Sequence, residues 1–312
     1  MAQPNFPVAS SYAGKAAGFY ISAALKQVNS LDYMTLMENV AYKSVIQRME
    51  GASLIADATC DFTDAGTLTM SEKILQTKEI QINVDLCKLQ LLTSWEALQM
   101  RAGAGAPPPP SFTDYVISYM GEIIANQTEL NIWQGVNTTG GEFDGFVGVG
   151  VGYLLPAGTN ADATVVQSAA TAAYTAGNII ANLQQLVTDI TGGTAVNILG
   201  KEDAGIYMNH KTYQFYISAV SALGYVNAYQ MNGDYEPRFE GIRIFVCNGM
   251  IDNQMVFAQT SNLYAGTSLL SDTTRINILD MANLDASENL RCVARYALGV
   301  QTGVGADIVR QS

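Results

Sequence analysis

The chain has one histidine, His210, and a hydrolase built on a serine or cysteine nucleophile would need it as the base. With a single histidine, a metal site that uses several histidines is excluded. The surrounding sequence, IYMNHKTYQFY, predicts a structural role instead. Asn209 or His210 caps a helix whose apolar positions recur at helical spacing as far as Leu223, and Gly224 ends it. We therefore expect no catalytic residue, and a soluble hydrolase using His210 is kept as a remote alternative.

Two glycine-containing stretches resemble nucleotide-binding motifs but lack the context that such motifs need. Residues 148–152 spell G-x-G-x-G, yet YLLP follows where a dinucleotide site requires the start of a helix. Gly200-Lys201 is followed by Glu202 instead of serine or threonine, so it does not form a phosphate loop. The sequence predicts no cofactor.

Carboxylates and cysteines are the other residues that could do chemistry. Three carboxylate pairs lie in loop-like sequence without apolar neighbours that would raise one pKa, and are predicted to be solvated: Asp61/Asp64, Glu142/Asp144 and Asp234/Glu236. The cysteines are far apart and form no C-x-x-C pair, which indicates neither a zinc site nor a disulfide framework. We expect buried free thiols at Cys60, Cys87, Cys247 and Cys292. No metal site is predicted.

Composition indicates a protein that hides much of its surface. Of 312 residues, 14% are charged and 48% hydrophobic, whereas a typical soluble chain is about 25% charged. The net charge is -12, and residues 102–200 contain no lysine or arginine. Tight DNA or RNA binding needs clustered cations, so it is not expected. The longest apolar stretch, Phe146 to Leu155, is half the roughly 20 residues of a membrane helix, so no membrane span is expected either.

The first part of the chain predicts one helix and one long hairpin. Residues 1–30 are irregular, and apolar spacing predicts a helix over Tyr33 to Arg48 that ends at Gly51. Residues 53–92 predict a two-stranded excursion whose return limb alternates strictly between polar and apolar residues over 79–86. An isolated two-stranded ribbon buries too little surface to be stable, so this one must lie on something.

The remaining sequence predicts an α+β fold without βαβ alternation. Thr93 to Glu96 fits a capping box for a short helix, a proline-rich linker covers 103–110, and residues 111–134 keep helical spacing as one long rod. An alanine-rich helical zone is expected over 164–190. Strands are expected at 195–199, 205–208, 242–246, 255–258 and 289–300.

This order of elements resembles the major capsid protein of tailed bacteriophages, the Hong Kong 97 fold. The resemblance covers residues 50 to 305 and depends on the order and spacing of several weak motifs. KEIQINVDLCKLQLLTSWEAL resembles the strand that leaves the family's extended loop, and SFTDYVISYMGEIIANQTELNIWQG resembles its spine helix. Four further stretches resemble later parts of the fold: GGEFDGF, IYMNHKTYQFYISAV, FEGIRIFVCNGM and RCVARYALGV.

The resemblance implies a division of the chain into the family's parts. These are an N-terminal arm and helix (1–50), an extended β-hairpin loop (51–92), a peripheral domain with the spine helix 111–134 (93–145 and 270–300), an axial domain (146–269) and a C-terminal tail (301–312).

The resemblance also implies a function. Such subunits form hexamers and pentamers that tile an icosahedral shell around double-stranded DNA, so the expected location is the virion, after assembly in the host cytoplasm. Expected partners are further copies of the chain, a portal protein, a separate scaffolding protein and, as an open case, a decoration protein. Packaged DNA is expected without tight binding, and no enzyme activity, cofactor, metal or membrane is expected. An encapsulin-type nanocompartment shell is the nearest alternative.

Contacts between subunits are expected from the extended loop and the arm. The predicted contact residues are Phe6, Tyr12, Phe62, Leu68, Met70, Ile74, Lys78, Ile80 and Ile82. Some family members join subunits covalently through a lysine of this loop. Lys73 and Lys78 lie in the corresponding region, but the partner residues cannot be matched, so no crosslink and no removal of an N-terminal segment are predicted.

Overall fold

The computed structural model describes residues 29–40, 42–52, 55, 57, 60, 66–87, 110–170, 172–223, 237–267, 276–281, 287 and 289–312. These residues belong to two compact units. The larger unit takes the described parts of 26–80, 125–273 and 296–312, and the smaller unit those of 81–124 and 274–295. The domain boundaries implied by the resemblance remain predictions.

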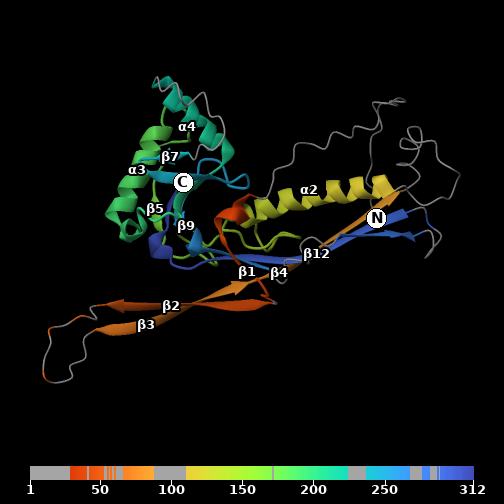
Figure 1. Cartoon of the computed structure of the whole chain (residues 1–312), viewed down its shortest axis with the longest axis horizontal. Coiled ribbons are helices and arrows are strands. Elements are labelled where there is room, and N and C mark those ends of the chain that lie inside the picture. The colour runs from red at the N-terminus through yellow and green to blue at the C-terminus, as the bar shows by residue number, and fades with distance from the viewer. Residues whose placement is uncertain are drawn as a thin grey trace. The chain divides into compact units, whose positions relative to one another are not determined.

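The larger unit contains a mixed six-stranded sheet. Its strands lie in the order β5 (Val166–Ser168), β13 (Val309–Gln311), β9 (Met255–Gln259), β6 (Ala204–Met208), β8 (Ile242–Val246) and β7 (Arg238–Phe239). The helices α3 (Ile179–Gly192) and α4 (His210–Ala222) lie beside these strands (Figure 1).

One part of this sheet corrects the expected topology. Strands β6 and β8 pair in parallel, and α4 connects them along the chain, so the unit contains a β-α-β crossover. The expectation of no βαβ alternation was wrong for this segment. Parallel neighbours need such a crossover, because a tight turn can only reverse the direction of the chain.

Helix α3 explains how the six-stranded sheet is stabilised. Its residues Ile179, Leu183, Leu186 and Ile190 recur at intervals of four, three and four, which places them on one face of the helix. All four are fully buried and share a cluster with residues of the sheet such as Phe257. Each fully buried side chain of this size contributes about 2 kcal/mol of hydrophobic stabilisation.

A second sheet contains β1 (Thr35–Met37), β10 (Leu263–Thr267), β12 (Asn289–Thr302) and β11 (Ile276–Asp280) in that order, and β4 (Lys78–Cys87) also pairs with β12. The end of β12 pairs with β10 in the larger unit, and its beginning pairs with β11 in the smaller unit.

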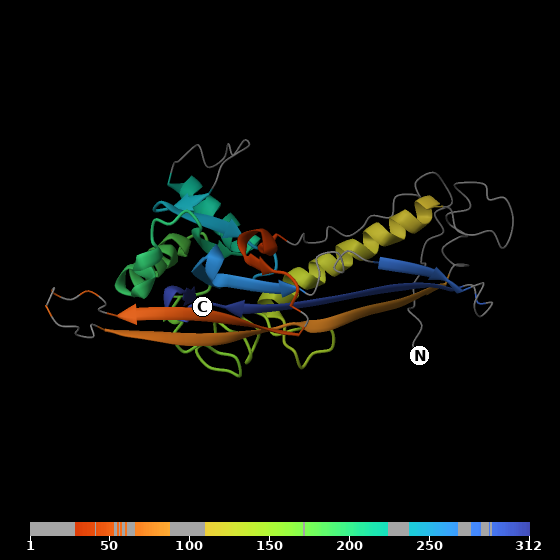
Figure 2. The ribbon, with the colours of Figure 1, turned by 60° about the horizontal axis from the view of Figure 1, so that its bottom comes forward.

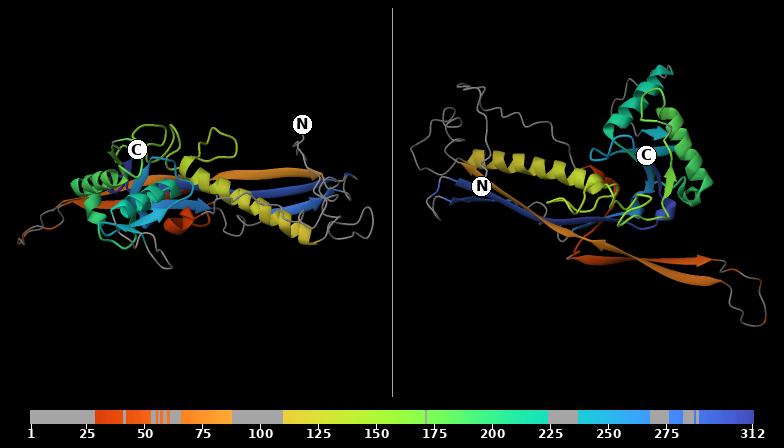
Figure 3. Two further views of the ribbon diagram at one scale, coloured as in Figure 1. Left: turned by 90° about the horizontal axis from the view of Figure 1, so that it is seen from above. Right: turned by 180° about the vertical axis from the view of Figure 1, so that it is seen from behind.

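Strands β2 (Lys43–Ala52) and β3 (Thr67–Gln76) form a separate two-stranded antiparallel ribbon. Lys43 lies opposite Gln76 at one end and Ala52 opposite Thr67 at the other. Figures 2 and 3 show the two strands side by side along this length. We call this pair the β2–β3 ribbon.

The ribbon corrects two predictions from the sequence. The helix predicted over 33–48 is wrong: a short 3-10 helix, η2 (Ser30–Tyr33), is followed by β1 and β2. Asn39 has a φ of 66°, which a right-handed helix cannot contain. The hairpin predicted over 53–92 is also wrong, because the ribbon covers 43–76 and the stretch predicted as the turn supplies most of β3. The predicted return limb is a strand, β4, but it pairs with β12 and not with a second limb of the hairpin.

The long helix was predicted correctly, since α2 covers Pro110–Gln134. The short helix predicted at 93–100 and most of the linker lie outside the described residues. Strands β6, β8, β9 and β12 confirm four of the five predicted strands.

Two later predictions were wrong. In place of a helix over 164–190 there is a short strand, β5, and α3 begins only at Ile179, because Val166 pairs with Val309 in the sheet. The strand predicted at 195–199 is a 3-10 helix, η3 (Thr194–Ile198), whose Ala195 and Ile198 are buried three positions apart. Two further 3-10 helices in the described residues are η5 (Thr260–Asn262) and η8 (Gly305–Asp307).

Candidate functional site

The β2–β3 ribbon has two chemically different faces. Residues directly opposite each other in an antiparallel pair share a face, and successive residues alternate between faces. One face, here the outer face, combines Val45, Met49, Leu68, Met70 and Ile74 with the polar pair Gln47 and Glu72. The other, the inner face, carries Ile46, Arg48, Ser71, Lys73 and Leu75.

The inner face is fixed to the rest of the larger unit where β3 ends. The side chain of Leu75 is fully buried over Gly266, and a Cβ built on Gly266 would lie 2.6 Å from a methyl carbon of Leu75. Gly299, which pairs with Gly266, has the backbone oxygen of Gln76 above it, and a Cβ there would lie 2.1 Å from that oxygen. These two glycines leave space for the ribbon to cross the sheet.

Hydrogen bonds add to this attachment. Lys73 Nζ donates to Asp162 Oδ2 at 2.5 Å and to Thr302 Oγ1 at 3.1 Å. The side chain of Gln301 donates to the backbone oxygen of Ile74 at 2.9 Å. Burial alone raises the pKa of Asp162, but the hydrogen bonds from Lys73 and Thr164 are stronger and hold that pKa below its ordinary value.

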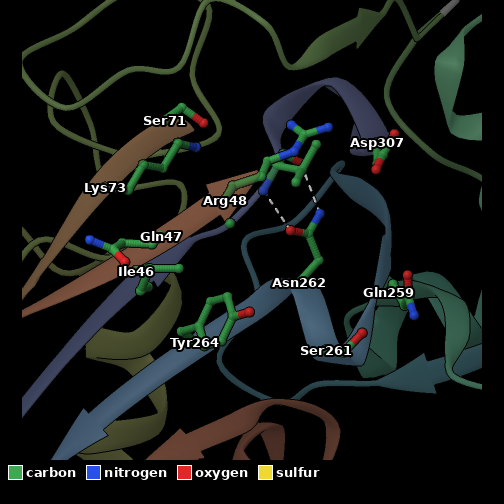
Figure 4. Close-up of a pocket in the computed structure, with 12 residues that line it drawn as sticks. Ile46, Gln47, Arg48, Ser71, Lys73, Gln259, Ser261, Asn262, Tyr264 and Asp307 are labelled. Atoms are coloured by element: carbon green, nitrogen blue, oxygen red, sulfur yellow. Dashed lines mark hydrogen bonds between the residues drawn. The ribbon is translucent and has the colours of Figure 1, made fainter. Parts of the chain in front are cut away.

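A small cleft of about 230 Å³ lies between the ribbon and the loops beside it. Figure 4 shows Arg48 and Lys73 on the ribbon side and Asn262 and Tyr264 on the other side. Asn262 is engaged with Val304, donating to its oxygen at 2.8 Å and accepting from its nitrogen at 2.6 Å. Ligand pockets usually have about 300–1,000 Å³, so the volume suits one or two side chains better than a cofactor.

The outer face is open to solvent within the chain. Its five apolar side chains are all exposed, from 49% for Val45 to 61% for Met49. Three of them, Leu68, Met70 and Ile74, were predicted as contact residues. Val45 and Met49 were missed because they were assigned to a helix. The apolar residues of KSVIQRME lie at 45, 46 and 49, a spacing that fits a helix and gives no local signal of a strand.

The other predicted contact residues have different surroundings. Ile80 is only 6% exposed, so its side chain offers almost no surface to another subunit, and Ile82 is half-buried. Lys78 Nζ donates to the backbone oxygens of Asn137 at 2.9 Å and Glu142 at 2.6 Å. Phe6, Tyr12 and Phe62 lie outside the described residues.

A buried carboxylate on α2 was not found from the sequence. Glu129 is fully buried and accepts hydrogen bonds from Ser30 N at 3.2 Å, Ser30 Oγ at 2.5 Å and Gly249 N at 3.0 Å. The indole nitrogen of Trp133 in turn donates to Ser30 Oγ at 2.7 Å. Glu129 therefore fixes the segment before β1 and the turn after β8 to the end of α2.

The residues considered for catalysis have structural roles. His210 is the exposed first residue of α4. Asn209, one of the two residues predicted as the helix cap, accepts a hydrogen bond from Thr212 N at 2.7 Å and so caps α4. In the described part of the chain, no group of three or more His, Cys, Asp and Glu residues could hold a metal ion.

Glu142 and Asp144 accept from the backbone amides of Val136 and Asn137 and so stabilise the turn after α2, whereas the other two acid pairs lie outside the described residues.

All four cysteines are free. Cys247 and Cys292 are buried as predicted, but Cys60 and Cys87 are exposed, so the prediction was wrong for these two. Burial raises the pKa of the Cys247 thiol, which leaves it protonated and unreactive near neutral pH.

None of the helices in the described residues is both long and apolar enough to cross a membrane.

Comparisons with known proteins identify the fold. No known protein family matches the sequence, and no curated protein shows significant similarity to it. Solved structures do match. A structure from Gordonia phage Cozz has a TM-score of 0.58 at 12% identity and covers 100% of this chain and 98% of its own. The capsid of the Myoviridae phage XM1 has a TM-score of 0.56 at 11% identity, with 96% and 97% covered.

A third structure, the capsid of the cyanophage P-SCSP1u, has a TM-score of 0.55 at 13% identity, with 95% of this chain and 90% of its own covered. The chain therefore has the fold of tailed-phage major capsid proteins over nearly its whole length, as its sequence predicted. At these identities the similarity concerns the fold.

Proposed function

We propose that this chain is the major capsid protein of a tailed bacteriophage, assembling as hexamers and pentamers into an icosahedral shell that encloses double-stranded DNA. The observation that carries the proposal is the match to phage capsid structures over nearly the full length of both chains.

The charge of the chain supports a wall that confines DNA without gripping it. Residues 102–200 contain acidic side chains but no lysine or arginine, and the whole chain has a net charge of -12. Proteins that bind DNA tightly use clustered cations to release its counterions. The shell would therefore retain DNA by enclosing it and not by binding it tightly.

The outer face of the β2–β3 ribbon is the proposed contact with a second copy of the chain. The inner face already has its partners within the subunit, whereas the outer face presents five exposed apolar side chains. A second copy is the expected occupant, because a shell built from one fold repeats its own surfaces. Phe6, Tyr12 and Phe62 stay predictions for the same contact.

Electron microscopy of the expressed protein tests the function directly. We expect closed particles of megadalton mass built from this chain, alone or with a scaffolding protein. Particles isolated from infected cells should contain double-stranded DNA. Particles that instead enclose a cargo enzyme would favour the encapsulin alternative, and a monomer at assembly concentrations, with or without scaffold, would contradict the proposal.

A pair of substitutions tests the contact. Val45→Ser together with Ile74→Ser should leave the subunit folded, because both side chains are exposed, but should reduce the yield of particles at least tenfold. Val149→Ser is the matched control, since Val149 is also exposed but lies outside the ribbon. Normal assembly of the double variant would contradict the proposed contact while leaving the shell function intact.

We further propose that the shell holds without covalent links. Lys73 donates to a carboxylate and a hydroxyl, and Lys78 donates to two backbone oxygens, so both amines have partners inside the subunit. Denaturing electrophoresis of assembled particles should show a single band of 33.4 kDa. A ladder of multiples would contradict this.

A further inference from the structure

Two methionines lie directly opposite each other on the outer face of the ribbon. Met49 and Met70 form a cross-strand pair, and their side chains are 61% and 59% exposed. Among the methionine side chains that the structure describes, only these two are exposed. The others are buried or half-buried: Met34, Met37, Met208, Met250, Met255 and Met281.

One polar pair and one apolar pair flank the two methionines on the outer face. The next pair along the outer face is Gln47 and Glu72, and the Gln47 amide already donates to Glu72 Oε1 at 3.0 Å. On the other side lie Gly51 and Leu68, which bring no side-chain donor. An added acceptor at either sulfur would be hydrated in the free subunit, and docking would remove that water, which costs free energy unless a new donor replaces it.

Oxidation places such an acceptor on the sulfur. A peroxide transfers one oxygen atom to the thioether: the S–O bond forms, the O–O bond breaks, and the sulfur loses two electrons. The other peroxide oxygen leaves as water or as an alcohol. The product, methionine sulfoxide, is polar where the thioether was apolar. Reaction requires access, which the exposed pair has and the buried methionines lack.

We propose that Met49 and Met70 form an oxidation site that controls docking of the ribbon. In the free subunit a peroxide oxidises the pair, and the sulfoxides prevent the outer face from packing on a second copy. In the assembled shell the same pair is covered and protected. This proposal rests on the proposed function, because it takes a second copy of the chain as the occupant of the face.

The test uses full-length protein with Cys60→Ser and Cys87→Ser, because these two exposed thiols would also react with peroxide. Dilute subunits are treated with hydrogen peroxide, mapped by mass spectrometry and then brought to assembly conditions. We expect Met49 and Met70 to oxidise at least tenfold faster than Met208 and Met255, and particle yield to fall at least tenfold. Oxidation of preassembled particles at Met49 and Met70 should be at least fivefold slower than in subunits.

The variant Met49→Leu with Met70→Leu separates this site from other oxidation. Leucine keeps an apolar side chain of similar size but has no sulfur, so the particle yield of the variant after peroxide should equal its own yield before peroxide. Loss of assembly by the treated leucine variant, unchanged assembly of the oxidised parent, or equal oxidation rates in subunits and particles would each overturn the proposal. Untreated parent that forms no particles would overturn the proposed function itself, which is a distinguishable result.

Discussion

The six-stranded sheet and the β2–β3 ribbon differ in whether their apolar residues are buried within the subunit. In the sheet, Ile206 and Phe257 are fully buried beneath residues of α3 and α4. In the ribbon, the inner face is held by the subunit, whereas Ile74 on the outer face remains 51% exposed. The sheet is thus complete within one chain, and the ribbon is only half covered. Substitutions in the two regions should therefore separate folding of the subunit from assembly.

The largest loss of subunit stability is expected for substitutions in α3, which packs against the six-stranded sheet. Leu183→Ala removes a fully buried side chain of α3 from the core cluster, and such changes cost about 3–4 kcal/mol of unfolding free energy. Urea unfolding of the unassembled subunit measures this loss. Leu183→Met, which nearly conserves volume, is the control and should cost less than about 1.5 kcal/mol. Equal losses for both variants would contradict the proposed packing role.

The next largest effect is expected at the buried carboxylate. Glu129→Ala leaves Ser30 N, Ser30 Oγ and Gly249 N without their acceptor, and unsatisfied buried donors should cost about 2–3 kcal/mol in total. Glu129→Gln keeps one acceptor oxygen and should lose about half as much. Urea unfolding ranks the two variants, and equal stability of Glu129→Ala and the parent would contradict the anchoring role.

The sequence correctly predicts elements that have a local signal. It fails where contacts with residues far away in the sequence determine the structure. Helix α2 has 25 residues of sustained helical spacing, which predicted it correctly. The spacing of Val45 and Met49 fits a helix as well as a strand, and only pairing with β3 decides between them. Glu129 carries no local signal at all, because Ser30 is 99 residues and Gly249 120 residues away.

A smaller, pH-dependent effect is expected where the ribbon meets the rest of the larger unit. Because the folded pKa of Asp162 lies below its ordinary value of 3.8, its contribution is present above that value and is lost as pH falls through the folded pKa. Asp162→Asn should therefore cost about 1 kcal/mol at pH 7 and progressively less as pH falls below 3.8. Unfolding of parent and variant from pH 2 to pH 7 should give curves that converge in acid, and a constant gap would contradict this.

The smallest effect on folding is expected on the outer face, where the ribbon's own two faces provide the sharpest comparison. Ile74→Ser changes an exposed side chain, so the unfolding free energy of the subunit should change by less than about 0.5 kcal/mol. Leu75→Ala, one residue further on the inner face, removes a fully buried side chain and should cost about 2–4 kcal/mol. Ile74→Ser should nevertheless assemble poorly at subunit concentrations where the parent forms particles. If Ile74→Ser destabilised the subunit as much as Leu75→Ala, the outer face would be covered within its own chain, and its burial would no longer need a second copy.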